Sequence, residues 1–189
     1  MTERDLLLDC LRRLNRLDID YMLTGSMASN FWGVPRTTHD LDFVVRFQPH
    51  QASLMVRAFD DQFFIQERSV QAAFEAPYQF NALDRRSGLK VDFWMLREDA
   101  FEQEMFRRRR RETLFDEPAW IATAEDVILH KLHWHRLTPS ERQVMDAAGV
   151  VAVQAERLDH NYLTLWASRL GLSEILAELL SGRRRPKST

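Results

Sequence analysis

The chain has 189 residues, of which 45% are hydrophobic and 29% are charged, with six glycines and six prolines. This length and composition fit one globular domain, or one domain with a small appendage, and exclude two full enzymatic domains or a disordered chain. The formal net charge of −2 excludes a global basic field of the kind that drives non-specific nucleic-acid binding.

The first part of the chain alternates between helical and strand patterns. Residues 5–17 carry apolar side chains at helical spacing, and residues 21–24 form an apolar run that suits a buried strand. Gly25 closes that run, and Ser26 is placed to cap a predicted helix over residues 27–32. The pattern then predicts a strand at residues 41–47, a helix at 49–60, a short strand at 63–65 and a helix at 70–75. A hairpin of residues 78–83 with 89–96 and a helix at 99–110 follow.

Helical signals crowd together after residue 117, and no further strand signal appears there. Residues 123–126 resemble a capping box that opens a helix to about residue 135, and residues 138–141 resemble a second box. Further helices are predicted at residues 161–170 and 173–180. We therefore predict an α/β (α+β) core over residues 1–117, a C-terminal helical region over residues 118–182 and a basic flexible tail over residues 183–189.

The sequence contains no signal for secretion or for membrane insertion. Cys10 is the single cysteine, so no internal disulfide is possible. The N-terminus is charged rather than basic and then apolar, and no stretch of about 18 apolar residues occurs. We therefore expect a soluble, cytoplasmic protein.

Three aspartates lie in or beside the predicted strands. Asp40 and Asp42 are two residues apart at the start of one strand, so both side chains point to the same face. Asp92 lies in the middle of another strand, where aspartate is disfavoured. If the two strands are neighbours, the three carboxylates converge. The alternative is an ordinary solvated face, because exposed strand faces often carry acids.

Converging carboxylates repel one another unless cations neutralise them. Oxygen-only ligands suit Mg²⁺ or Mn²⁺, which bind through a few carboxylates and substrate phosphates, and two such ions can clamp an in-line displacement at phosphorus. Gly25 and Ser26 follow a strand and open a helix, so they offer free backbone N–H groups and a hydroxyl to phosphate. On its own, this pair is an ordinary Gly-Ser turn.

Together these motifs resemble the signature of the DNA polymerase beta-type nucleotidyltransferase superfamily. The resemblance rests on three strings in this order: Leu23-Thr24-Gly25-Ser26, Asp40-Leu41-Asp42-Phe43 and Val91-Asp92-Phe93. Within the superfamily the chain is most similar to small bacterial abortive-infection and toxin–antitoxin nucleotidyltransferases. That similarity rests on Gly25-Ser26-Met27-Ala28, Arg36-Thr37-Thr38 and Thr123-Ala124-Glu125-Asp126, and it covers about residues 20–150. It implies a mixed sheet flanked by helices and followed by a small helical region.

The resemblance also implies roles for particular residues. Asp40 and Asp42 would hold the metals, and Asp92 would bridge them or accept the proton of the attacking hydroxyl. Gly25 and Ser26 would cradle phosphates, with Arg36 and Thr38 nearby. Lys131 would neutralise triphosphate charge, although an ordinary surface lysine is an equal alternative.

Other charged and histidine-rich segments have simpler interpretations. Arg142 and Asp146, one helical turn apart, are predicted to form an intrahelical ion pair rather than to lie at the mouth of the site. His130, His133 and His135 lack a cysteine partner, so structural histidines are favoured over a zinc site. The arginines at 107–111 suit a helix C-terminus, with a phosphate-binding patch for RNA as the alternative.

The resemblance therefore predicts a Mg²⁺-dependent or Mn²⁺-dependent enzyme. It would transfer NMP from an NTP such as ATP to a hydroxyl acceptor and release pyrophosphate. The acceptor would be a tRNA 3′ end, a protein or a small molecule such as an aminoglycoside or lincosamide antibiotic. The resemblance also suggests a toxin–antitoxin or phage-defence component with an antitoxin partner. The alternative is a catalytically silent binding or antitoxin-like module with the same fold.

Overall fold

The computed structural model describes residues 2–17 and 19–183. The chain divides into two compact units: residues 1–24 with 38–121, and residues 25–37 with 122–189. The predicted boundary at residue 117 stays a prediction about domains, and in the structure residues 25–37 group with the C-terminal helices. From residue 184 on, the predicted basic tail lies outside the described residues.

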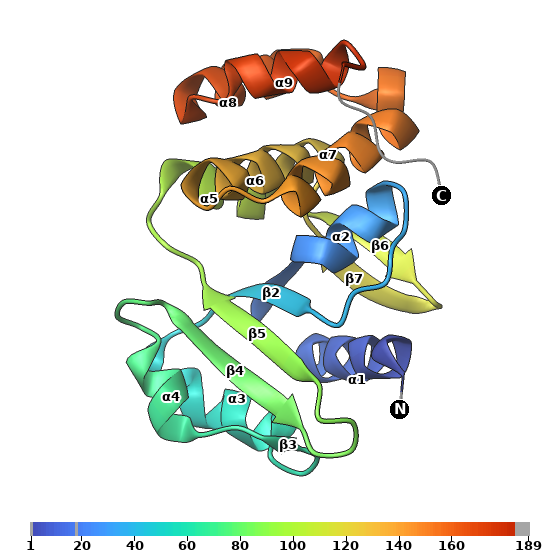
Figure 1. The fold of residues 1–189 in the computed structure, drawn as a ribbon. Helices are drawn as coiled ribbons and strands as arrows, with labels where there is room; N and C mark the ends of the chain where they lie inside the picture. The colour runs from blue at the N-terminus through green and yellow to red at the C-terminus, as the bar shows by residue number, and fades with distance from the viewer. Residues whose placement is uncertain (1, 18, 184–189) are drawn as a thin grey trace. The chain divides into compact units, whose positions relative to one another are not determined.

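The first unit contains a mixed sheet, which confirms the predicted fold class. Within the described residues this sheet has seven strands in the order β3-β4-β5-β2-β1-β7-β6 (Figure 1). The strands are β1 (Asp20–Thr24), β2 (Leu41–Arg46), β3 (Phe63–Phe64), β4 (Gln79–Asp84), β5 (Lys90–Met95), β6 (Arg110–Leu114) and β7 (Glu117–Ile121). β2 pairs with β5 and β1 with β7 in parallel, and the other neighbours are antiparallel. The antiparallel pair of β4 and β5 is the predicted hairpin.

A row of aromatic rings on the buried face fixes the register of the central strands. Phe43 on β2, Phe93 on β5 and Phe80 on β4 are register partners, and all three are buried. The ring of Phe93 stacks on that of Phe43 at 5.8 Å and on that of Phe80 at 5.0 Å between centroids. Because side chains alternate between faces, a slip of one residue would move these rings to the solvent face and carry acids into the core. The apolar row therefore holds the next row, which contains Asp42 and Asp92, on the opposite face.

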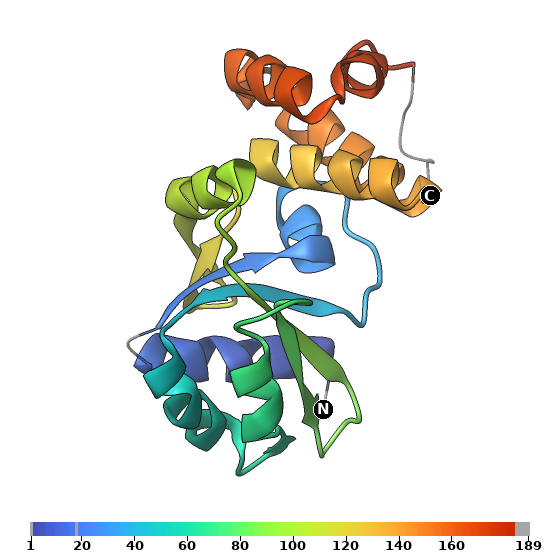
Figure 2. The same ribbon diagram turned by 90° about the vertical axis from the view of Figure 1, so that its left-hand side faces the viewer.

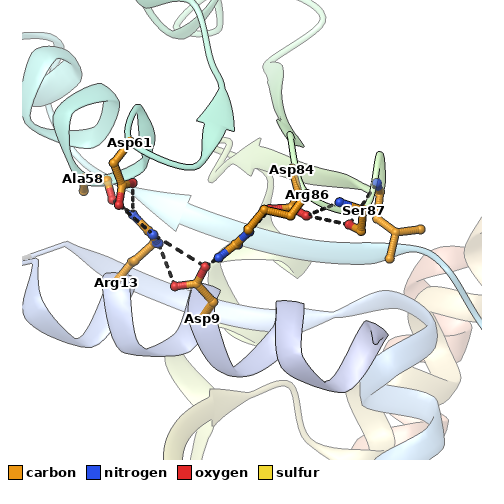
Figure 3. A network of polar contacts seen from close by, with 8 residues as sticks. Asp9, Arg13, Ala58, Asp61, Asp84, Arg86 and Ser87 are labelled. Atoms are coloured by element: carbon orange, nitrogen blue, oxygen red, sulfur yellow. Dashed lines mark hydrogen bonds and ion pairs between the residues drawn. The ribbon is translucent and has the colours of Figure 1, made fainter. Parts of the chain in front are cut away.

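Helices and a polar network complete the first unit. Its helical segments are α1 (Glu3–Arg16), the 3₁₀ turn η1 (Pro49–Gln51), α3 (Ala52–Phe59), α4 (Glu67–Ala72) and α5 (Ala100–Arg108). Figure 3 shows Arg13 and Asp9 of α1 joined to two other segments of the unit. Arg13 forms an ion pair with Asp61 at 2.6 Å, and Asp9 pairs with Arg86 at 2.6 Å. Arg86 also pairs with buried Asp84 at 2.7 Å, so α1 is tied to the end of α3 and to the β4–β5 turn.

The second unit is helical. Its elements are α2 (Gly25–Trp32), α6 (Ala124–Leu137), α7 (Glu141–Gln154), the 3₁₀ turn η2 (Ala155–Arg157), α8 (His160–Leu170) and α9 (Ser173–Leu180). α6 packs against α2, α7 and α8, and α9 packs against α7 and α8 (Figure 2). Gly33 lets the chain after α2 approach α7 closely, because a Cβ atom at this position would lie 2.7 Å from the Val150 nitrogen. Helix α6 begins at the predicted cap, where the Thr123 hydroxyl accepts the Asp126 N–H at 3.2 Å.

Several predicted boundaries are wrong. The chain continues in strands after residue 110: β6 and β7 form an antiparallel pair, and Leu23 of β1 pairs with Ile121. Helix α2 begins at Gly25 instead of Met27, and α7 begins at Glu141 after Ser140, whose side chain forms no capping hydrogen bond. No helix within the described residues is both long and apolar enough to cross a membrane.

Candidate active site

Four polar residues form one row across the middle of the sheet. Thr24 is the register partner of Asp42, Asp42 of Asp92, and Asp92 of Asn81. The row therefore crosses β1, β2, β5 and β4, with side chains on one face. The structure confirms that the strands of Asp42 and Asp92 are neighbours, which was the condition for the carboxylates to converge.

Two side-chain oxygens in this row are buried without a hydrogen-bond partner among the described residues. They are Oγ1 of Thr24 and Oδ1 of Asp92, and they flank Asp42 on its two neighbouring strands. Leaving a buried polar atom unsatisfied costs about 1–3 kcal/mol, and more for a charged group. Asp42 itself accepts a hydrogen bond from Nε1 of Trp94 at 3.4 Å. Two of the three buried oxygens that lack a partner among the described residues thus lie on the face that carries the predicted metal ligands, which indicates a site that a ligand completes.

The third aspartate, Asp40, immediately precedes β2 and is exposed. Its backbone N–H donates to Oγ1 of Thr38 at 3.3 Å, so the hydroxyl of Thr38 shapes the entry to the strand. Thr38 belongs to the first unit with the aspartates, whereas the other predicted phosphate-binding residues belong to the second.

Lys90 is a site residue that the sequence did not single out. Its Nζ lies 2.8 Å from Oδ2 of Asp92, and the two residues share a face because they are two apart on β5. The hydrogen bond with Asp92 raises the pKa of Lys90 despite partial burial, and the charges of Asp92, Asp42 and Asp40 raise it further. One ammonium group is thus within electrostatic reach of all three predicted metal ligands.

The chemistry of the row fits a hard divalent cation. Within the described residues, no three His, Cys, Asp or Glu side chains are arranged so that together they could hold a metal ion. Asp42 and Asp92 nevertheless face each other by register, and the second carboxylate keeps one buried oxygen without a partner. Mg²⁺ and Mn²⁺ prefer such oxygen ligands and keep open positions for phosphate and water.

The second unit holds a separate cluster of buried charges. Asp146 of α7 accepts hydrogen bonds from Nε and Nη2 of Arg36, at 2.6 and 2.7 Å, and from Nζ of Lys131 at 2.8 Å. The predicted pair of Asp146 with Arg142 is therefore wrong, because Asp146 faces two cations from other segments. Burial favours the neutral carboxyl, but the hydrogen bonds from Arg36 and Lys131 outweigh it and lower the pKa of Asp146.

Ser26 belongs to the same cluster. Its buried hydroxyl oxygen accepts Nη2 of Arg36 at 2.9 Å and Nζ of Lys131 at 3.4 Å. Both acceptor positions of the hydroxyl are used by these cations, which leaves its proton to donate to a further group. Gly25, immediately before it, has a φ of 62°, a conformation that favours glycine. The interpretation of Lys131 as a surface residue is wrong, since its side chain is only 6% exposed.

The arginine run has partners within the chain. Arg107 and Arg108 lie in the last turn of α5, as predicted for a helix C-terminus, and Arg110 and Arg111 begin β6. Arg107 pairs with Glu104 at 2.6 Å, Arg109 with Asp20 at 2.8 Å and Arg110 with Glu112 at 3.4 Å. The run therefore offers less positive charge to a polyanion than its five arginines suggest.

Comparison with known proteins identifies the fold. No protein-family model matches the chain, and no curated protein matches it by sequence. An antigenic nucleotidyltransferase-like protein from Paracoccidioides brasiliensis is 15% identical with a TM-score of 0.56, covering 98% of this chain and 94% of that chain. The antibiotic-resistance factor ANT(2'')-Ia is 12% identical with a TM-score of 0.60, covering 93% and 97%.

A third solved structure is the lincosamide antibiotic adenylyltransferase LnuA with bound lincomycin. It is 10% identical with a TM-score of 0.52, covering 80% of this chain and 96% of that chain. At such low identities these similarities establish the fold alone. The chain has the nucleotidyltransferase fold, with a mixed α/β sheet flanked by helices.

Proposed function

We propose that this protein is a divalent-metal-dependent nucleotidyltransferase that transfers NMP from an NTP to a hydroxyl acceptor and releases pyrophosphate. The observation that carries the proposal is the pair of unsatisfied buried oxygens, of Thr24 and Asp92, on either side of Asp42. A silent module with the same fold would gain nothing from holding a carboxylate oxygen buried and unsatisfied at this position.

Asp40, Asp42 and Asp92 are the residues that would hold Mg²⁺ or Mn²⁺. The bound ion would neutralise phosphate charge and polarise the reacting phosphoryl group. The aspartates would hold the ion on one face of the sheet, opposite the aromatic row, and so set where the phosphates of an NTP bind. Trp94 would hold Asp42 in place through its indole N–H.

The cluster in the second unit fits phosphate recognition. Arg36 and Lys131 together carry two positive charges and Asp146 one negative charge, so one positive charge is in excess in a largely buried cluster. The hydroxyl of Ser26 has its proton left to donate, and Gly25 allows the close backbone turn before it. We propose that Ser26 and Arg36 bind the triphosphate.

Lys131 has a different proposed role from the one predicted. Arg36 keeps 29% of its side chain exposed, whereas Lys131 and Asp146 are almost fully buried. An NTP phosphate would therefore meet Arg36 first. Lys131 and Asp146 would act as positioning residues that hold Arg36 and Ser26.

The acceptor is proposed to carry a free hydroxyl group. One solved structure of ANT(2'')-Ia contains adenylyl-2''-tobramycin, and that of LnuA contains lincomycin, so small-molecule antibiotics are the first acceptors to test. A tRNA 3′ end and a protein hydroxyl are tested alongside them. Labelled tRNA would extend the proposal to a toxin–antitoxin or phage-defence role.

The test is label transfer from each α-labelled NTP, with Mg²⁺ or Mn²⁺, to separate pools of antibiotics, tRNA and protein. We expect one pool to be labelled and the rate to fall by at least about 100-fold in Asp42→Asn. Asp116→Asn is the matched control, because Asp116 is exposed in the β6–β7 turn at a φ of 68° that asparagine also adopts. Labelling that persists in Asp42→Asn, or that is absent from every pool, contradicts the proposed transfer.

A further inference from the structure

We infer that the ammonium group of Lys90 is the counter-ion of the acidic row, by which we mean Asp40, Asp42 and Asp92. A divalent cation must displace this ammonium group from Asp92 in order to bind. The inference rests on the proposed function, because it concerns the metal-binding step of the same site. It assigns Lys90 as a positioning residue that sets the affinity of the site for its metal.

The strand register places Lys90 in the row of charges. Val91 pairs with Leu41 across β5 and β2. Lys90 precedes Val91, and Asp40 precedes Leu41, so the cation and this carboxylate occupy adjacent positions on the two strands. One register step further, Asp92 pairs with Asp42. The face therefore carries three acids and one base, and the base is in direct contact with Asp92, whose side chain is 14% exposed.

The contact satisfies only half of the Asp92 carboxylate. Nζ of Lys90 is 2.8 Å from Oδ2, whereas Oδ1 is buried and has no hydrogen-bond partner among the described residues. A lysine ammonium is a compact charge on a flexible stem, and it cannot clamp both oxygens in the way that arginine does. A divalent cation carries twice the charge of the ammonium group, and no side-chain stem restricts its approach to the carboxylate oxygens.

Exposure makes Lys90 able to leave. Its side chain is 53% exposed, whereas that of Asp92 is 14% exposed. An ion pair in which one partner is exposed contributes only about 0–1 kcal/mol, so the ammonium can turn to water at little cost. Metal binding must still overcome this pair, and removing the ammonium should therefore tighten metal binding. An ordinary surface ion pair without a role in the site would have no such effect.

The test is a Mn²⁺ titration of the full chain, with free Mn²⁺ measured by electron paramagnetic resonance. We expect Lys90→Met and Lys90→Gln to lower the dissociation constant for Mn²⁺ by about two- to fivefold. Lys90→Arg, which keeps a cation and can grip both oxygens of Asp92, is expected to bind Mn²⁺ no more tightly than the natural protein. Arg57→Met removes an exposed cation from α3 and controls for the general change in charge.

Thermal melting provides a second readout that does not depend on activity. Without Mn²⁺, Lys90→Met should melt at a lower temperature, because Asp92 then lacks a counter-ion. With saturating Mn²⁺ it should gain more in melting temperature than the natural protein does. A merely structural lysine would lower both melting temperatures equally, and that result would overturn the inference.

The variant Asp92→Asn separates the proposed metal site from the inference about Lys90. If Asp92→Asn loses Mn²⁺ binding while Lys90→Met and the natural protein bind equally tightly, the inference about Lys90 fails and the proposed metal site stands. If Asp92→Asn binds Mn²⁺ as tightly as the natural protein, the proposed metal site fails and the inference falls with it.

Discussion

The buried carboxylate of Asp146 offers a quantitative test of the charge cluster in the second unit. Asp146→Leu removes the acceptor that faces Arg36 and Lys131, and it leaves the ammonium of Lys131 buried with only a 3.4 Å hydrogen bond to Ser26. Breaking a buried ion pair by removing one partner costs about 3–5 kcal/mol. We expect a loss of about 3 kcal/mol in the free energy of unfolding, because Arg36 is partly exposed and can turn to water.

The double variant Asp146→Leu with Lys131→Met should recover most of this loss. Replacing a buried ion pair with apolar side chains of similar volume is often neutral or stabilising. A double-mutant cycle should then give a coupling free energy of about 2 kcal/mol between the two residues. Urea unfolding, followed by circular dichroism at pH 7, measures each variant. Glu156→Gln removes an exposed acid from the same unit and should change stability by less than about 0.5 kcal/mol.

The same variants predict a pH dependence. Since the folded pKa of Asp146 is lowered, its contribution to stability is fully present above the unfolded carboxyl pKa of about 4 and is lost as the pH falls through the folded pKa. The natural protein should therefore lose more stability below about pH 4 than the double variant does. If the free energy of unfolding of Asp146→Leu lies within about 1 kcal/mol of that of the natural protein, the buried cluster is not the ion pair that we describe.

Three further changes test the fold and the acidic row by urea unfolding. Asp84→Ala removes the buried acceptor of Arg86 and should cost about 1–3 kcal/mol at pH 7; an unchanged midpoint would show that the network is dispensable. Gly33→Ala should cost about 1–3 kcal/mol through overpacking against α7, whereas Gly149→Ala, whose nearest contact would be 3.3 Å, should cost less; the reverse order would contradict the packing. Thr24→Val replaces an unsatisfied buried hydroxyl with a methyl group and should stabilise the protein by about 1 kcal/mol; a loss of stability would mean that the hydroxyl has a partner.

The acidic row could be predicted because it depends on the two-residue alternation of side chains along a β-strand. The two-residue period of a strand places Asp40 and Asp42 on one face, and the apolar residues between and after them identify the other face. Only the pairing of β2 with β5 was missing, since a parallel pair joins segments far apart in the chain. Lys90 was overlooked because its importance comes from this pairing and from its contact with Asp92.

The features that were missed depend on contacts between distant segments. β7 contains Pro118, which lacks a backbone N–H, and β6 begins with two arginines, so neither has the apolar pattern of a buried strand. β6 forms at the edge of the sheet because it pairs with β7, and β7 pairs with both β6 and β1. Similarly, Arg142 is the neighbour of Asp146 at helical spacing, but the fold supplies Arg36, 110 residues away in the sequence, and Lys131.

The two clusters differ in a way that bears on catalysis. In the second unit the buried carboxylate of Asp146 accepts hydrogen bonds from two cations, so its charge is compensated within the cluster. In the first unit the carboxylate of Asp92 is half-satisfied: Lys90 contacts Oδ2, and buried Oδ1 has no hydrogen-bond partner among the described residues. Folding alone does not favour the arrangement in the first unit, because an unsatisfied buried carboxylate oxygen lowers stability. A divalent cation has the charge that the carboxylate of Asp92 lacks, and Asp42 is its register partner on the neighbouring strand. The unsatisfied oxygen of Asp92 is therefore the reason to expect that metal binding stabilises the first unit.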